Sequence, residues 1–238
     1  MKKQKIKKCE TRTTGVGRMS EEEMLKLVGK QKSTNHPRYR LARFKYAINL
    51  IDKKHNNVVL DIGCGLAPAS YLLPEDNKII LVDNFSNVGL NSKNYPKKTK
   101  NIDLNKKLPF PDKYTDIVLA LGVLEHIVNL HSLLDEIYRV LKKDGLFIGC
   151  VPNMCSLSAR IKWFLGKLPR YSAEVVEADR DRHISDWTFK KVEAVLTQHG
   201  FQVETSDFGL WHGETLLIPK GFIKKTFTDR IFFKAWKK

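Results

Sequence analysis

Long apolar runs are missing from this sequence of 238 residues. No stretch approaches the roughly 20 consecutive apolar residues that a membrane-spanning helix requires, and the lysine-rich residues 1–8 have no apolar stretch behind them of the kind a signal peptide carries. The four cysteines, Cys9, Cys64, Cys150 and Cys155, have neither metal-ligand nor disulfide-framework spacing. We therefore expect a globular protein of the reducing cytoplasm, with no metal site.

Acidic residues are scarce at both ends of the chain. Residues 1–50 hold 14 Lys and Arg against 4 Asp and Glu, residues 220–238 hold 7 against 1, and residues 51–219 hold 21 of each. The whole formal net charge of +16 therefore lies at the ends, which argues against a nucleic-acid groove across the centre. Basic ends can attract nucleic acid, anionic lipid or an acidic substrate. A lysine-rich segment that only aids solubility is the alternative.

Two short apolar runs, each with an acid at or near its end, carry the main functional signal. Residues 58–62 contain Asp61 and lead into a turn made of Gly63, Cys64 and Gly65, and the run at 79–82 is followed directly by Asp83. Such runs are typical of parallel strands buried on both faces. A glycine turn lets the backbone approach a ligand, and a carboxylate ending the second strand can accept hydrogen bonds from ribose hydroxyls. A nucleoside-containing cofactor is predicted, with a purely structural turn as the alternative.

The glycine turn distinguishes two kinds of cofactor. A dinucleotide site needs G-x-G-x-x-G/A, and here Pro68 stands where the third small residue belongs. Asp61 would also bring negative charge towards a pyrophosphate. S-adenosylmethionine has an ammonium and a sulfonium and no phosphate, so an acid before the turn suits it better.

Further segments of strand and helix spacing alternate along the chain. Four more apolar segments read as strands, at residues 101–104, 114–121, 146–151 and 201–203, and an antiparallel seventh is expected at 215–218. Within the domain, helical spacing occurs in four groups: Leu41, Phe44, Ile48 and Ile51; Leu133, Leu134, Ile137, Val140 and Leu141; Leu157, Ile161, Phe164 and Leu165; Phe189, Val192, Val195 and Leu196. This order predicts an α/β fold: one Rossmann-like domain with a seven-stranded, mostly parallel sheet, an antiparallel last strand, and helices on both faces.

The expected organisation has three parts. Residues 1–34 form a basic arm, residues 35–221 form the domain, and residues 222–238 form a basic amphipathic tail. Ile223, Phe227 and Ile231 recur every four residues in the tail, which is typical of a helix at a membrane interface; a helix that packs back onto the domain is the alternative. Residues 153–187 form an insertion at the ligand-binding edge of the sheet, which we interpret as a substrate lid or else as a solvated excursion.

In order and spacing these segments resemble the class I S-adenosylmethionine-dependent methyltransferases, in particular the branch with small-molecule substrates. The family pattern reads L-D-x-G-C-G, a strand-ending acid, D-x-x-x-L-P-F, V-L-E-H and R-V-L-K-x-G-G. The chain resembles it closely over residues 58–152 and loosely over 183–203. It departs from the pattern at Leu66-Ala67-Pro68, where a further glycine is usual, and at Asp144, where the family often has glycine.

The resemblance implies a set of contacts with the cofactor. The backbone of Gly63, Cys64 and Gly65 would face its methionine and ribose portions, with Asp61 near the amino group. Asp83 would hold the ribose hydroxyls, with Asn84 beside it.

The other implied contacts lie on later segments. Asp103 would accept a hydrogen bond from the adenine amine, the Leu104 N–H would face the ring, and the Leu121 carbonyl would bind the methionine ammonium. His126 and His183 are the candidate bases for an acceptor hydroxyl or amine, since histidine titrates near neutral pH; a structural role is the alternative for each.

The acceptor implied is a small molecule, a glycan or a lipid-linked compound, methylated on oxygen or nitrogen. DNA is excluded as a partner, because the Asn/Asp-Pro-Pro-Tyr/Trp motif is absent and Cys150 is not preceded by proline. The basic ends indicate peripheral contact with an anionic membrane. Two other functions stay open: a cofactor-binding scaffold without turnover, and an RNA methyltransferase that uses the basic arms. The sequence does not fix the oligomeric state.

Overall fold

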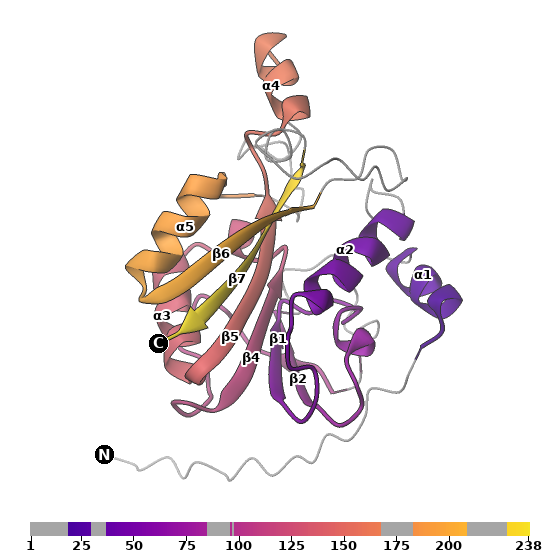
Figure 1. Ribbon diagram of the computed structural model, residues 1–238, viewed down its shortest axis with the longest axis vertical. Helices are drawn as coiled ribbons and strands as arrows, with labels where there is room; N and C mark the ends of the chain where they lie inside the picture. The colour runs from indigo at the N-terminus through magenta and orange to yellow at the C-terminus, as the bar shows by residue number, and fades with distance from the viewer. Residues whose placement is uncertain (1–18, 30–36, 85–95, 97, 168–182, 209–227) are drawn as a thin grey trace.

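A seven-stranded sheet in the order β3-β2-β1-β4-β5-β7-β6 forms the centre of the protein (Figure 1). The computed structural model describes residues 19–29, 37–84, 96, 98–167, 183–208 and 228–238. The strands are β1 (Val58–Ile62), β2 (Lys78–Asp83), β3 (Lys100–Asn101), β4 (Thr115–Leu121), β5 (Leu141–Pro152), β6 (Phe201–Phe208) and β7 (Arg230–Lys237). The pairs among β1 to β5 are parallel, and β7 runs antiparallel to both of its neighbours. The Rossmann-like single domain predicted from the sequence is confirmed.

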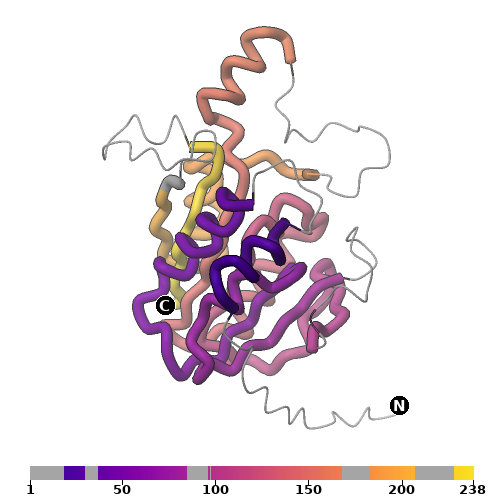
Figure 2. The backbone as a smooth tube through the Cα atoms, turned by 90° about the vertical axis from the view of Figure 1, so that its right-hand side faces the viewer, coloured from indigo at the N-terminus to yellow at the C-terminus, as the bar shows by residue number. Residues whose placement is uncertain are grey.

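Helices cover both faces of the sheet (Figures 1 and 2). They are α1 (Glu21–Gly29), α2 (Pro37–Asn49), α3 (Leu130–Val140), α4 (Leu157–Phe164) and α5 (Phe189–Gln198), with short 3-10 turns η1 (Ser70–Leu72) and η3 (Leu124–His126). One apolar cluster joins α3 and α5 to the sheet, and a second joins α1 and α2 to the opposite face. Among the described residues no helix is long and apolar enough to cross a membrane.

The helical periodicities of the sequence correspond to observed helices. Leu41, Phe44 and Ile48 of α2 are all buried, as are Leu133 and Ile137 of α3. The stripe on α2 packs against a face of the sheet, in the same apolar cluster as α1.

The boundary of the basic arm at residue 34 is wrong, because residues 21–29 form α1. Ser20 and Glu23 make reciprocal hydrogen bonds, with the Ser20 N–H donating to Glu23 Oε2 at 2.7 Å and the Glu23 N–H donating to Ser20 Oγ at 3.2 Å. This capping box begins the helix. Met24 and Val28 are then buried against α2 and its cluster. Residues 1–18 lie outside the described part of the chain.

The tail is a strand of the domain, not an amphipathic helix. Residues 230–237 form β7, paired with β5 on one side and β6 on the other. Ile231 and Phe233 face the α3 and α5 cluster, and Phe232 faces the α1 and α2 cluster. A run that is apolar on both faces is typical of a fully buried strand. The four-residue spacing of Ile223, Phe227 and Ile231 therefore did not predict the structure of residues 230–237 correctly. Residues 222–227 lie outside the described part of the chain, as does the seventh strand expected at 215–218.

Close packing between β5 and β7 gives a first prediction. A Cβ atom added to Gly149 would lie 2.2 Å from the ring of Phe233, which is 0% exposed and has no room to move. Gly149→Ala should therefore lower the free energy of unfolding by about 1–3 kcal/mol through overpacking, measured by urea denaturation.

Two variants control this experiment. Gly29→Ala adds a methyl group only 3.7 Å from Pro37, an ordinary contact, and should change stability by less than half as much. Phe233→Leu combined with Gly149→Ala should be less destabilised than the sum of the two single changes. An unchanged urea midpoint for Gly149→Ala would contradict the packing of β7 against β5.

Candidate cofactor and acceptor site

The glycine turn after β1 is held in one conformation by its neighbours. Gly63 and Gly65 have positive φ angles of 61° and 53°, and a Cβ atom on Gly63 would lie 2.5 Å from Val123 Cγ2. The Cys64 N–H donates to the Val82 carbonyl at 3.1 Å, which ties the turn to β2. Burial raises the pKa of the Cys64 thiol above its usual value. Cys64 is thus a small packed residue without the character of a nucleophile.

Asp83, the last residue of β2, binds the same turn from the other side. Its Oδ2 accepts from the Gly65 N–H at 2.7 Å, and its Oδ1 accepts from the Asn84 N–H at 2.7 Å. The residue is 5% exposed. Burial raises the pKa of the Asp83 carboxyl, although the two backbone donors oppose the shift.

Asp61 lies deeper, near the end of β1. It is 3% exposed, and its Oδ2 accepts from the Ser70 hydroxyl at 2.6 Å. Burial raises the pKa of Asp61 to about 7, and the nearby Asp83 charge adds to the shift. A buried carboxylate with a raised pKa favours a cationic partner, because a nearby positive charge stabilises the ionised form.

The third acid follows β3. The Ile102 N–H donates to the Asp83 carbonyl at 2.9 Å, so the segment leading to Asp103 runs beside the end of β2. Asp103 Oδ1 accepts from the Asn105 N–H at 3.0 Å, and this bond lowers the pKa of Asp103. Leu104 is buried behind it. The structure thus places Asp61, Asp83 and Asp103 at the carboxyl ends of adjacent strands, as the sequence predicts.

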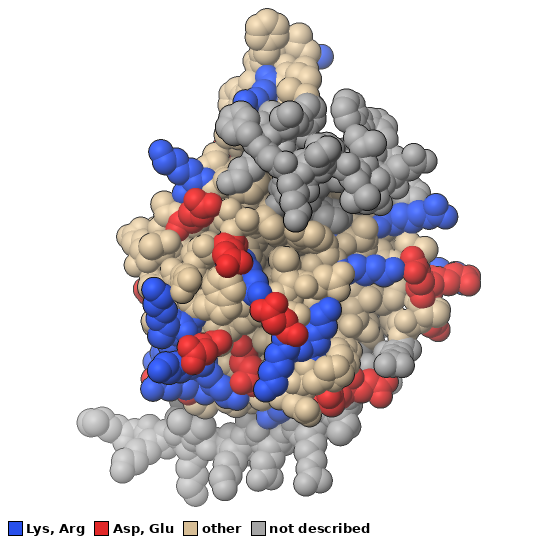
Figure 3. Space-filling view, in the orientation of Figure 1, with Lys and Arg blue, Asp and Glu red and all other residues tan. Residues whose placement is uncertain are grey.

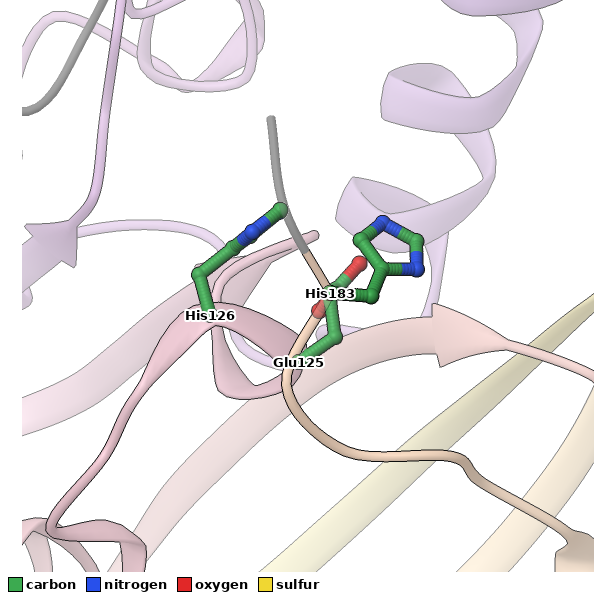
Figure 4. Close-up of side chains that lie close together, drawn as sticks. All are labelled: Glu125, His126 and His183. Carbon is green, nitrogen blue, oxygen red and sulfur yellow. The ribbon is translucent and has the colours of Figure 1, made fainter. Parts of the chain in front are cut away.

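The two candidate histidines meet beyond the end of β4. Leu121 ends that strand, and η3 then carries Glu125 and His126. His183 comes from a segment much later in the chain, and its ring lies 4.8 Å from that of His126, between centroids, at 75° (Figure 4). The Ile184 N–H donates to the Glu125 carbonyl at 2.8 Å, which holds the two segments together.

Beside the histidines is a buried group of charged side chains that the sequence reasoning did not assign. Arg230 Nη1 lies 3.5 Å from Glu125 Oε1, and the two side chains are 7% and 2% exposed. The Tyr39 hydroxyl donates to both oxygens of Asp229, at 2.6 and 2.5 Å. Arg43 is also buried, and both burial and the neighbouring Arg230 lower its pKa.

One signal for this group was present in the sequence. Arg43 lies between the apolar positions that face the sheet, where a charged side chain is unusual. Its Nε, like Glu125 Oε2, is buried with no hydrogen-bond partner in the described structure. Buried polar atoms of this kind are expected to bind a ligand or ordered water.

Three side chains here offer ligand atoms that a metal could use. Those of Glu125, His126 and His183 all lie within 4.8 Å of one another. Arg230, however, already balances the charge of Glu125, and Arg43 and Asp229 add one nearby charge of each sign. Because the two arginines balance the two carboxylates, the group has no excess negative charge to bind a cation, and we assign no metal to these residues.

The two departures from the family pattern both occur where the backbone is left-handed. Ala67 has φ 54° and Asp144 has φ 60°, which explains why glycine is usual at these positions. A non-glycine residue in this region costs about 1–2 kcal/mol. Ala67 is 0% exposed, and its N–H donates to the Cys64 carbonyl at 2.7 Å, so the turn keeps its shape despite the strain.

Comparison with known proteins agrees with this geometry. A family model described as a methyltransferase domain matches residues 60–149, the segment that carries all three strand-end acids. A solved S-adenosylmethionine-dependent methyltransferase of Thermotoga maritima, described as a possible histamine N-methyltransferase, has a TM-score of 0.62 over 84% of this chain and 91% of its own, at 16% identity. Residues 60–149 are therefore similar to a methyltransferase domain, and the fold is that of S-adenosylmethionine-dependent methyltransferases. This similarity implies S-adenosylmethionine as the cofactor.

The curated relatives that this chain matches are each matched over only part of their own length. An uncharacterised protein of Methanocaldococcus jannaschii is 41% identical over 116 residues, which is 46% of this chain and 49% of the relative. The mitochondrial arginine hydroxylase NDUFAF5 of Rattus norvegicus is 33% identical over 158 residues, 63% of this chain and 43% of the relative. The chain thus spans about half the length of these relatives.

Burial of Asp61 gives a prediction about stability and pH. Its pKa is raised from 3.8 to about 7, so the folded protein keeps a proton that the unfolded chain releases between those values. Stability should fall as pH rises through that window. Asp61→Asn, which can still accept from Ser70, should raise the free energy of unfolding by about 1–3 kcal/mol at pH 8 and by much less at pH 5.

Urea denaturation at the two pH values checks this prediction. Asp144→Asn serves as the control, because Asp144 is exposed and asparagine tolerates the same left-handed backbone. Equal effects of Asp61→Asn at pH 5 and pH 8 would show that Asp61 is not a buried charge.

Proposed function

We propose that this protein transfers a methyl group from S-adenosylmethionine to an oxygen or nitrogen of a small-molecule, saccharide or lipid-linked acceptor. The proposal rests on one observation: two sets of residues with different chemistry lie close together at the carboxyl ends of neighbouring strands. Acids and a glycine turn follow β1 and β2, and two histidines lie beyond β4. The strand order reverses between the parallel neighbours β1 and β4, and open α/β sheets bind ligands at such a point.

The residues on the β1 and β2 side fit the cofactor. Asp61, which burial keeps partly protonated, would bind the methionine ammonium together with the Leu121 carbonyl. Asp83 would accept from the ribose hydroxyls while it holds the Gly65 N–H, since a carboxylate has several acceptor sites. Asn84 would support the ribose, and Asp103 and the Leu104 N–H would contact adenine. A pyrophosphate would instead face two buried acids, which disfavours a dinucleotide.

On the acceptor side, the chain needs to position a nucleophile and remove its proton. The bound cofactor supplies an activated methyl group whose leaving group is a neutral thioether. His126 and His183 are the proposed bases that take the acceptor proton, and Glu125 and Arg230 would orient polar groups of the acceptor. Buried Arg43 adds a hydrogen-bond donor suited to a hydroxyl or an anionic substituent.

Surface charge bears on the RNA alternative. On the face in Figure 3, lysine and arginine are interspersed with aspartate and glutamate over the sheet and its helices. Several basic residues of the described structure are paired with acids, such as Lys234 with Asp52 at 2.5 Å and Lys142 with Asp116 at 2.8 Å. RNA binding favours a continuous basic surface, so a smaller acceptor is the better proposal.

A cofactor variant tests the first part of this function. Asp83→Ala should weaken S-adenosylmethionine binding by about 1.5–3 kcal/mol, because the ribose hydroxyls lose an ionised acceptor. Isothermal titration calorimetry measures the affinity, and Asp76→Ala, an exposed carboxylate, is the control. Wild-type protein that prefers NAD, or an Asp83→Ala affinity equal to that of wild type, would refute the assignment.

Histidine variants test the second part. His126→Ala and His183→Ala should each reduce methyl transfer about 100-fold or more while leaving cofactor affinity within twofold, as expected for an interaction made in the transition state. His131 and His199 form a matched control pair, with ring centroids 5.1 Å apart, on α3 and after α5.

Labelled methyl transfer into lipid, glycan, RNA and small-molecule fractions of a cell extract supplies the assay. Label in the RNA fraction would favour the RNA alternative, and cofactor binding without transfer into any fraction would favour a scaffold. Full activity of both site variants would show that neither histidine acts as a base, and the protein would then act only by positioning the acceptor against the methyl group.

A further inference from the structure

Helix α4 projects from the end of the domain (Figures 1 and 2), and most of its large apolar side chains are exposed. Ile161 is 51% exposed, Trp163 53%, Phe164 91% and Leu165 60%. These four lie within the short segment 161–165, whereas the rest of the described surface exposes only two large apolar residues, Val128 and Ile184. A concentrated apolar surface of this kind indicates an interaction site.

The apolar stripe of α4 points away from the domain. Successive helical residues are rotated by about 100°, so Leu157, Ile161, Phe164 and Leu165 lie along one side. Ala159, the one buried residue of the helix, is on the opposite side. The stripe therefore faces away from the side on which Ala159 is buried.

The base of α4 is firmly attached to the ligand-binding edge of the sheet. Ser156 caps the helix by accepting from the Ala159 N–H at 3.3 Å. The Met154 N–H donates to the Trp187 carbonyl at 3.0 Å, which ties the start of the helix to the segment that carries His183. Because β5 ends at Pro152, α4 begins just beyond the edge that carries the histidines.

Positive charge flanks the apolar stripe. Arg160 and Lys162 lie on either side of it, Lys167 follows the helix, and residues 153–167 contain no acid. No ion pair in the described structure joins these three side chains to a carboxylate, and Figure 3 shows blue side chains against the tan projection. Exposed Phe and Leu side chains flanked by Lys and Arg are typical of a helix that lies in a membrane interface.

We propose that α4 inserts its apolar stripe into the surface of an anionic membrane and so brings the acceptor edge of the sheet to a membrane-bound substrate. The choice of acceptor rests on the proposed function; the membrane contact does not. A second copy of this chain is a poorer occupant, because pairing two α4 stripes would bring two sets of Arg160, Lys162 and Lys167 together without a counter-charge.

Vesicle sedimentation of the full-length protein tests the contact, with vesicles of phosphatidylcholine alone and of phosphatidylcholine with phosphatidylglycerol. The protein should bind the anionic vesicles more tightly, and added salt should weaken binding. Ile161→Ser combined with Phe164→Ser should reduce binding about tenfold or more. Val128→Ser, which removes an equally exposed apolar side chain elsewhere, should change it less than twofold.

The basic residues are tested separately. Arg160→Gln combined with Lys162→Gln should reduce binding to anionic vesicles by about fivefold per charge, whereas Lys143→Gln combined with Lys190→Gln, two exposed lysines on other elements, should have much less effect. The salt dependence of the first variant should be smaller than that of the wild type.

Calorimetry of S-adenosylmethionine binding accompanies each variant and should show unchanged affinity, which separates loss of membrane contact from loss of the cofactor site. Wild-type protein that ignores anionic vesicles at low salt would overturn the membrane proposal and leave the methyltransferase proposal standing. Dimers in analytical ultracentrifugation that Phe164→Ser dissociates would also overturn it, because α4 would then serve self-association.

Discussion

Strand β7 lies between β5 and β6, and the second half of the domain depends on this placement. It is the only described strand that joins β6 to the rest of the sheet. Because it is antiparallel to β5, its first residue, Arg230, pairs with Pro152 at the edge where ligands bind. Arg230 and Asp229 thereby come to lie beside Glu125 and Tyr39. A strand that completes the core therefore also supplies charge to the proposed acceptor site.

The placement of the three acids on the proposed cofactor side could be predicted from sequence because it depends on local geometry. Asp61 lies near the end of one apolar run, and Asp83 and Asp103 each end or follow another. Parallel strands in one sheet bring such positions to the same edge whatever the remaining topology. Only their hydrogen bonds, such as that from the Gly65 N–H to Asp83, required the structure. At Ala67 and Asp144, where the sequence departs from the family pattern, only the φ angles of the structure show why glycine is favoured.

The acceptor side could be predicted only in part, because its contacts join distant segments. His126 and His183 were named individually, but the hydrogen bond from Ile184 to Glu125 that brings them together joins segments far apart in the sequence. The pairing of Glu125 with Arg230 depends on the register of β7, and the helical spacing of Ile223, Phe227 and Ile231 concealed that strand. A short apolar run with basic flanks fits a helix and a buried strand about equally well until its partners are known.

The position of β7 also has a consequence for how the chain acquires its structure. Both strands that flank β7 precede it in sequence, so β5 keeps an open edge and β6 lacks a partner until residues 230–237 pair with them. Contacts of such wide sequence separation form slowly, and an unpaired apolar edge is a template for association between chains. Folding intermediates of this protein should therefore aggregate most readily through the open edge of β5. That strand contains Phe147, Ile148 and Val151.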